Sequence, residues 1–167
     1  MRTIKFRGRR IDNNEWVYGY LYRLKLPNGE ACVILTQDNN HLDNSLEPKY
    51  HLAFTLWVDL FIVEPVTVGQ FTGLYDKNGK EIYEGDILRY PAEDKFDEEN
   101  FVSFEVFWHD NDCADNHVGW QMNRHHFHGN ICGARELSRF LPKYTKKMVV
   151  IGNIHDNPEL LKGGKNE

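Results

Sequence analysis

Hydrophobic and polar residues alternate along the first part of the chain, and a period of two is typical of β-strands. In the opening segment Ile4 and Phe6 fall on one face, while Lys5 and Arg7 fall on the other. Turn-forming residues (Asp12-Asn13-Asn14 and Pro27-Asn28-Gly29) separate this segment from two stretches rich in aromatic and β-branched residues. The pattern predicts a β-meander with strands over the opening segment, 16–24 and 31–36.

The middle of the chain holds an apolar run and two turn signals. The run 52–63 is β-branched in part and ends before Pro65, which favours a strand over a short helix. Asn78-Gly79 is the signal of a tight hairpin turn, because glycine supplies the positive φ that such turns need. Gly85-Asp86 then leads into another apolar strand, an arrangement analogous to the opening of small SH3-like barrels.

The last part of the chain predicts further strands and one or two short helices. A strand over 101–108 carries apolar residues on both faces, which predicts burial on both sides or a subunit contact. Its expected partner is 118–122, and a closing strand is expected over 148–154. Residues 134–140 predict a short helix, and Pro158 suits the first position of a last helical turn.

These patterns predict a mainly β protein with a boundary near Pro65. The expected parts are an N-terminal β-meander over 1–65, a C-terminal SH3-like β-barrel over 66–162 and a disordered tail over 163–167. No apolar run approaches the roughly 20 residues of a membrane-spanning helix. The basic N-terminus is not followed by the apolar segment of a signal peptide, so we expect a cytoplasmic protein that does not enter membranes.

Composition adds limits on partners and chemistry. Of the 167 residues, 41% are hydrophobic and 13% are aromatic, which is enough apolar area for a packed core. The three cysteines are expected to be reduced in the cytoplasm. The formal net charge of −5 argues against a generic nucleic-acid binder, which would carry a clear basic excess.

Cysteines and histidines concentrate in the C-terminal half, and two pairs of them have a spacing of four residues. A zinc ion accepts thiolate and imidazole ligands in a tetrahedron, so two such pairs could hold one ion. The spacing is not a recognised zinc signature, and loop histidines with buried free cysteines are the favoured interpretation. The residues of this less favoured metal site are Cys113, His117, His128 and Cys132.

No motif predicts an enzyme or a cofactor. Cys113 has Asp115 and His117 nearby in sequence, but proximity along the chain does not make a catalytic dyad. The glycines at 69, 73 and 79 match neither a phosphate-binding loop nor a dinucleotide fingerprint. We therefore expect no catalytic residues and no cofactor, and a metal-dependent enzyme is the least favoured alternative.

The first ten residues are basic and contain no acidic residue. Arg7, Arg9 and Arg10, with tyrosines at 18, 20 and 22 nearby, could track a nucleic-acid backbone and stack on its bases. The favoured alternative is a solvated edge strand whose arginines discourage edge-to-edge aggregation. The acidic stretch 91–100 adds a third option, because it could dock on the arginines of a neighbouring copy.

Three blocks of the sequence resemble one protein family. They are Ile4-Lys5-Phe6-Arg7-Gly8, the continuous run 69–90 containing Gly73-Leu74-Tyr75-Asp76-Lys77-Asn78-Gly79-Lys80-Glu81-Ile82-Tyr83-Glu84-Gly85-Asp86, and the stretch 148–161 containing Gly152-Asn153-Ile154-His155-Asp156-Asn157-Pro158. Together they resemble the YopX family of phage and prophage proteins, which has no assigned biochemical activity. The resemblance implies a phage or prophage origin.

Two classes of function follow from these observations. The favoured one is a non-enzymatic binding or assembly module that associates with itself or with a phage or host protein. The alternative is a nucleic-acid-associated accessory protein that uses the arginine-rich N-terminal strand. Within the family blocks, we interpret the turn glycines and the carboxylate and amide side chains as determinants of folding.

Overall fold

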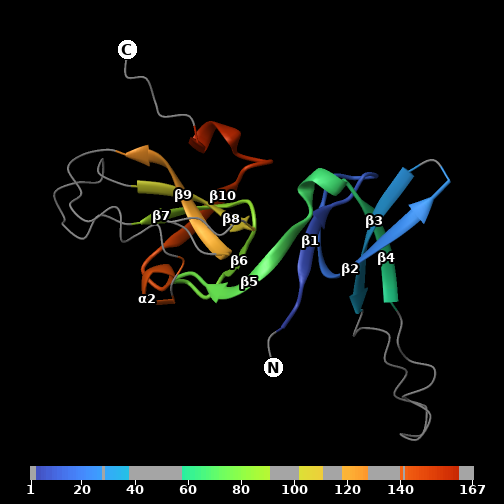
Figure 1. Ribbon diagram of the computed structural model, residues 1–167, viewed down its shortest axis with the longest axis horizontal. Coiled ribbons are helices and arrows are strands. Elements are labelled where there is room, and N and C mark those ends of the chain that lie inside the picture. The colour runs from blue at the N-terminus through green and yellow to red at the C-terminus, as the bar shows by residue number, and fades with distance from the viewer. Residues whose placement is uncertain are drawn as a thin grey trace, which may run out of the picture. The chain divides into compact units, whose positions relative to one another are not determined.

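The computed structural model describes residues 3–27, 29–37, 58–90, 102–110, 118–127, 140 and 142–161 (Figure 1). The protein is mainly β, as predicted, and the chain divides into two compact units, Met1–Gln70 and Phe71–Glu167. The sequence-based boundary at Pro65 falls on the short 3-10 helix η2 (Pro65–Thr67). Among the described residues, no helix has the length and apolar character needed to cross a membrane.

The first unit is an antiparallel meander, in agreement with the sequence pattern. Its strands are β1 (Phe6–Arg9), β2 (Trp16–Leu26), β3 (Gly29–Gln37) and β4 (Val58–Val63). β2 and β3 contain the strands predicted over 16–24 and 31–36 and extend beyond them. β4 confirms the end of the strand predicted over 52–63, whose first part lies outside the described residues.

The end of β1 also bonds to β4, which curls the first unit around its core. Arg10 forms a bridge with Val63, and the Glu64 amide donates to the Arg9 carbonyl at 2.9 Å. The enclosed side chains are apolar, because alternate residues of every strand face inward. They are Cys32, Ile34 and Val63, with Phe6, Val17, Leu21 and Val68 packed against them.

Strand β5 (Gly69–Tyr75) carries the chain from the first unit into the second. Its first residues pair with β1, and its later residues pair with β6 (Glu81–Tyr83). Hydrogen bonding thereby connects six strands in the order β4-β3-β2-β1-β5-β6. The turn between β5 and β6 is the predicted Asn-Gly turn, and Gly79 has the expected positive φ of 81°.

The second unit holds an antiparallel sheet of four strands in the order β10-β7-β8-β9. These strands are β7 (Asp86–Tyr90), β8 (Val102–His109), β9 (Gly119–Phe127) and β10 (Val149–Asn153). Their core is made of large apolar side chains: Ile82, Leu88, Phe104, Val106, Met122, Phe140, Met148 and Val150. Among the described residues the sheet is open, so the closed SH3-like barrel predicted for this half is not observed.

Several smaller predictions for the second unit are confirmed. β8 and β9 pair as expected, and Phe104 and Val106, which share one face of β8, are buried, whereas Phe107 on the other face is half-buried. Trp108 at the end of β8 is 44% exposed, however, so burial does not extend along the whole strand. The described helices are the four-residue α2 (Pro142–Thr145) and two 3-10 turns, of which η4 (Pro158–Leu161) begins at the predicted proline. The helix predicted over 134–140 lies almost entirely outside the described residues.

Candidate functional site

The outer face of the first unit presents a row of large side chains to solvent. Tyr18, Tyr20 and Tyr22 occupy alternate positions of β2, so all three fall on the same face of the sheet. They are 44%, 64% and 57% exposed. The opposite face carries the core residues Val17 and Leu21, and burial of that face fixes which residues point outward.

The strand register extends this row across three strands. Tyr20 lies opposite Leu35 and Leu35 opposite Leu60, while Tyr22 lies opposite Val33 and Val33 opposite Ile62. Residues directly opposite in an antiparallel pair share a face. Leu60 is 57% and Ile62 is 47% exposed. We call the exposed set Tyr18, Tyr20, Tyr22, Leu60 and Ile62 the tyrosine face.

No charged residue occupies the outward positions of β2, β3 and β4 within the described strands. The alternation places Arg23, Lys25 and Asp59 on the other face. On the side of β1, the Lys5 ammonium lies 5.7 Å from the centroid of the Tyr18 ring. The face is therefore apolar with three phenol groups, and its basic rim lies along one side.

The structure places the three arginines of the opening segment in contacts within the first unit. Arg7 is only 5% exposed, and its guanidinium lies 4.9 Å from the Trp16 ring centroid. Arg9 donates to Glu64 at 2.8 Å. The charge of Arg9 is thereby balanced by a carboxylate, and Arg7 has little surface to offer a ligand.

Arg10 is held by a carboxylate and an aromatic ring. Its guanidinium donates two hydrogen bonds to the Asp12 carboxylate and lies 4.3 Å from the Phe61 ring centroid. The hydrogen bond from Arg10 lowers the pKa of Asp12 and raises that of Arg10. Arg7 lies directly opposite Tyr18, so the structure does bring part of the basic segment beside the tyrosines, while Arg9 and Arg10 contact carboxylates of the first unit.

The four positions of the less favoured metal site, Cys113, His117, His128 and Cys132, lie outside the described residues. Within the described ranges, no cluster of three or more His, Cys, Asp or Glu side chains could hold a metal ion. Cys32, the one cysteine in those ranges, is buried in the core of the first unit with a free thiol. The acidic stretch 91–100 also falls outside the description.

The carboxylates of the family-like blocks bind backbone amides. The Asp76 side chain is buried and accepts hydrogen bonds from the amides of Asn78 at 2.7 Å and Lys80 at 2.9 Å. Its other oxygen accepts from the Val150 amide of β10 at 3.1 Å. Asp86 is also buried and accepts from the Tyr83 amide at 2.8 Å, which closes the turn around Gly85.

The last block is organised in the same way around Asn153. The Asn153 side-chain oxygen accepts from the amides of His155 and Asp156, both at 2.9 Å. Gly152 packs so closely on Asn157 that a Cβ at this position would lie 2.3 Å from the Asn157 Oδ1. The structure thus agrees with the interpretation of these side chains as determinants of folding.

The sequence pattern singled out the three tyrosines of the tyrosine face, but it did not identify Leu60 and Ile62 of β4 as exposed members of that face. The signal for Leu60 and Ile62 lies in the run Val58-Asp59-Leu60-Phe61-Ile62, where Phe61 turns inward. Because nearly every residue of this run is apolar, its pattern cannot show which alternate set is buried. The pairing of β4 with β3 shows that Leu60 and Ile62 belong to the outward set.

Comparison with known proteins places the chain in a family. No curated protein matches the chain. Among solved structures, the crystal structure of protein EF1440 from Enterococcus faecalis is similar with a TM-score of 0.48 and 24% sequence identity, over 97% of this chain and 100% of that one. The YopX protein family model matches residues 5–162, which is nearly the whole sequence. The chain therefore belongs to the YopX family.

Proposed function

We propose that the protein is a non-enzymatic binding and assembly module that associates with a second copy of itself through the tyrosine face. The observation that carries this proposal is the exposure of five large side chains on β2 and β4, on a face where the outward positions of β2, β3 and β4 hold no charged residue within the described strands. Contiguous exposed apolar surface of this kind marks interaction sites in soluble proteins. The phage or prophage setting suggested by the sequence blocks is part of the same proposal.

The size of the tyrosine face suits the centre of an interface. With a surface on the order of 200 Å² for each large side chain, the exposed fractions amount to roughly 500 Å². A standard interface buries about 800 Å² on each partner, with an apolar centre and a polar rim. The face therefore supplies the apolar centre, and surrounding residues such as Lys5 would supply the rim.

Self-association is supported by the lack of charged residues at the outward positions of β2, β3 and β4 within the described strands. In a two-fold dimer the same patch meets itself, so a charged side chain close to the axis would face its own copy. The outward positions of β2, β3 and β4 avoid that repulsion, because they carry only apolar residues, tyrosine, glycine and glutamine. Tyrosine also suits a centre of this kind, since it adds large contact area and a hydroxyl for hydrogen bonding.

A phage or host protein docked on the same face is the competing occupant. Its interface would be equally apolar, but nothing would require the purified chain to associate with itself. Nucleic acid tracked by Arg7, Arg9 and Arg10 is less favoured, because Arg9 and Arg10 contact Glu64 and Asp12 and Arg7 is buried.

The test is the molar mass of variants measured by size-exclusion chromatography with light scattering. Tyr20→Lys and Ile62→Lys together place two charges on the tyrosine face, and in the self-associated form each would meet its copy. Val66→Lys is the matched control, because Val66 is 79% exposed on η2, outside the face. We expect the double variant to be a monomer, while the control and the wild type share one larger mass.

Two results would overturn the proposal. One is a wild type that stays monomeric at every concentration tested, which would leave the face to another protein. The other is a double variant that keeps the mass of the wild type while its circular dichroism is unchanged. Circular dichroism separates loss of association from loss of folding in either case.

A further inference from the structure

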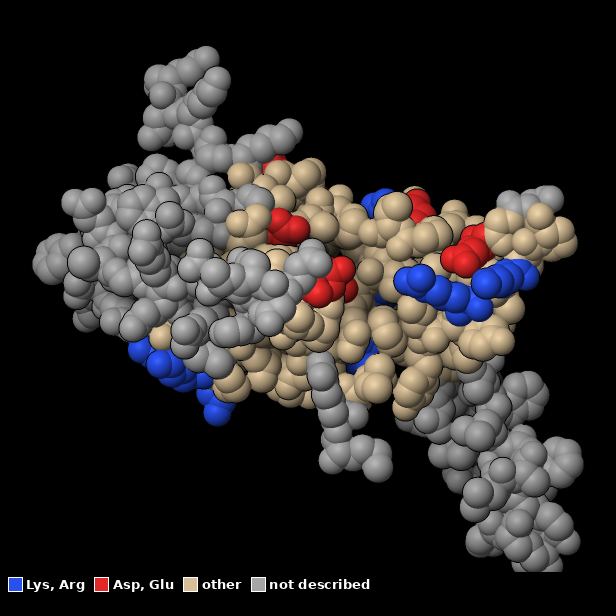
Figure 2. Space-filling model, in the orientation of Figure 1, with Lys and Arg blue, Asp and Glu red and all other residues tan. Residues whose placement is uncertain are grey.

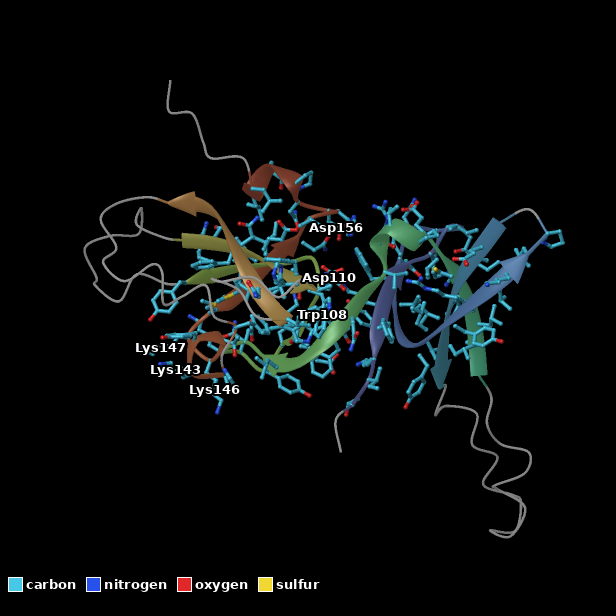
Figure 3. All side chains as sticks on the ribbon, viewed as in Figure 1. Trp108, Asp110, Lys143, Lys146, Lys147 and Asp156 are labelled. Carbon is cyan, nitrogen blue, oxygen red and sulfur yellow. The ribbon has the colours of Figure 1, made fainter. Side chains whose placement is uncertain are left out.

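A group of exposed lysines lies around α2 in the second unit. Lys143 belongs to this short helix, and Lys146 and Lys147 follow it directly; Figure 3 labels all three and shows them gathered at this end of the unit. In the same orientation, Figure 2 shows a blue surface at that place. A fourth lysine, Lys77, comes from the turn between β5 and β6.

Backbone hydrogen bonds hold these two segments together. The Lys77 amide donates to the Met148 carbonyl at 2.9 Å, so Lys77 lies beside the residue that follows Lys147. Met148 is fully buried in the core, and it anchors the end of the lysine-bearing segment. We call Lys77, Lys143, Lys146 and Lys147 the lysine surface. Lys80, also exposed, extends it along the same turn.

We propose that the lysine surface binds the phosphate backbone of single-stranded nucleic acid. This site is distinct from the tyrosine face and from the arginines of the opening segment, and it does not depend on self-association. Lysine ammonium groups on flexible stems bind phosphates as point charges, and binding releases the counterions condensed on the strand. The net charge of −5 does not prevent this, because the local potential depends on how charges are distributed over the surface.

The lysines differ from the arginines in how their charge is balanced. Arg9 and Arg10 contact carboxylates within their own unit. By contrast, Lys77, Lys143 and Lys146 are exposed, and within the part of the chain that the structure describes their ammonium groups form no ion pair. Within the described residues, no carboxylate therefore balances the charge of these three lysines.

Aromatic rings beside the lysine surface favour a single strand over an acidic protein. Tyr75 directly precedes the turn that carries Lys77, is 49% exposed, and packs edge-on against Phe71 at 5.5 Å between centroids. Tyr144 lies between the α2 lysines, with the Lys143 ammonium 4.6 Å from its ring centroid. Tyr144 is half-buried against the core, so Tyr75 is the exposed ring beside the lysines. Lysines next to an exposed ring match the pattern of sites that stack unpaired bases while tracking the backbone.

The experiment measures binding of a fluorescein-labelled thymidine 30-mer to the full chain by anisotropy, over a series of salt concentrations. The test variant is Lys143→Gln with Lys146→Gln. Its matched control is Arg23→Gln with Lys25→Gln, which removes the same charge from exposed positions of β2. We expect the test variant to bind more weakly and to lower the salt slope by about 0.7 for each phosphate that the protein no longer neutralises, while the control stays close to the wild type.

A second variant tests the stacking component. Tyr75→Ala should weaken binding roughly fivefold or more with an unchanged salt slope, because stacking adds affinity without releasing counterions. Poly-glutamate serves as the competing anion. The proposal is overturned if the wild type shows no salt-dependent binding, or if the two double variants bind equally. It is also overturned if poly-glutamate displaces the strand at equal charge and Tyr75→Ala has no effect, since that outcome identifies an acidic protein as the ligand.

Discussion

The carboxylate of Asp76 accepts a hydrogen bond from the amide of Val150 at 3.1 Å, across 74 positions of the chain. The same carboxylate closes the turn between β5 and β6 through the amides of Asn78 and Lys80. One buried side chain thus joins the hairpin turn of the central block to the last strand of the sheet. Two blocks far apart in the sequence are linked by a specific contact.

We predict that Asp76→Ala destabilises the second unit by about 2–4 kcal/mol, because it leaves the buried amide of Val150 and two turn amides without an acceptor. Asp76→Asn should cost less, since its one side-chain oxygen can still accept from the turn amides although its NH2 group cannot accept from Val150. Urea unfolding followed by circular dichroism measures both. Asp110→Ala is the control, as Asp110 is exposed at the end of β8. Equal stability of Asp76→Ala and the control would refute the role assigned to Asp76.

A substitution at Gly152 tests how closely this residue packs on Asn157 in the last family-like block. Gly152→Ala would place a Cβ 2.3 Å from the Asn157 Oδ1, so Asn157 must move and give up its contact with the Asn153 amide. We expect a loss of roughly 1–3 kcal/mol in the free energy of unfolding. In a double-mutant cycle with Asn157→Ala, the two losses should be clearly less than additive. Strict additivity would show that the clash is not the cause.

The turn at Gly79 tests backbone strain in the absence of a clash. A Cβ at Gly79 would meet no heavy atom within 4 Å, yet φ is 81°. Gly79→Val should therefore cost about 1–2 kcal/mol from the left-handed conformation alone, and Gly79→Asn less, because asparagine tolerates that region. Thermal unfolding ranks the variants. If Gly79→Asn were as unstable as Gly79→Val, strain in φ would not explain the glycine.

The contact between Arg10 and Asp12 predicts a pH effect. The hydrogen bond from Arg10 lowers the pKa of Asp12, so the folded state is favoured above the ordinary pKa of an aspartate. This contribution is lost as the pH falls through the lowered value. An NMR titration of the Asp12 carboxyl carbon should give a pKa below the ordinary range, and Arg10→Gln should return it toward that range. An Asp12 pKa in the ordinary range in the wild type would contradict the hydrogen bond from Arg10 as the cause of the lowered pKa.

Much of the fold was predictable from local signals. The strands of the meander follow from alternation at 16–24 and 31–36, and the turns at Gly79 and Gly85 follow from glycine and its acidic or amide neighbours. The closed barrel that the sequence predicted for the second half is not observed among the described residues. Whether the edge strands of a sheet meet depends on twist and long-range pairing, which no short pattern specifies.

The candidate sites, too, were predictable where local signals define them and not where long-range pairing does. Tyr18, Tyr20 and Tyr22 are visible as an alternating set, but Leu60 joins them only through the register of β3 with β4. The arginines were prominent in the sequence, yet their partner Glu64 is 55 positions from Arg9. The lysine surface was missed because Lys77 and Lys147 come together only when the turn bonds to Met148.

Sedimentation equilibrium of the wild-type chain over a range of concentrations tests self-association through the tyrosine face most directly. We predict that the mass rises from the 19.7 kDa of one chain toward twice that value as concentration increases. The variant with Tyr20→Lys and Ile62→Lys should remain at 19.7 kDa throughout. A wild type that stays at the mass of one chain, or a folded variant that associates as strongly as the wild type, would contradict the account.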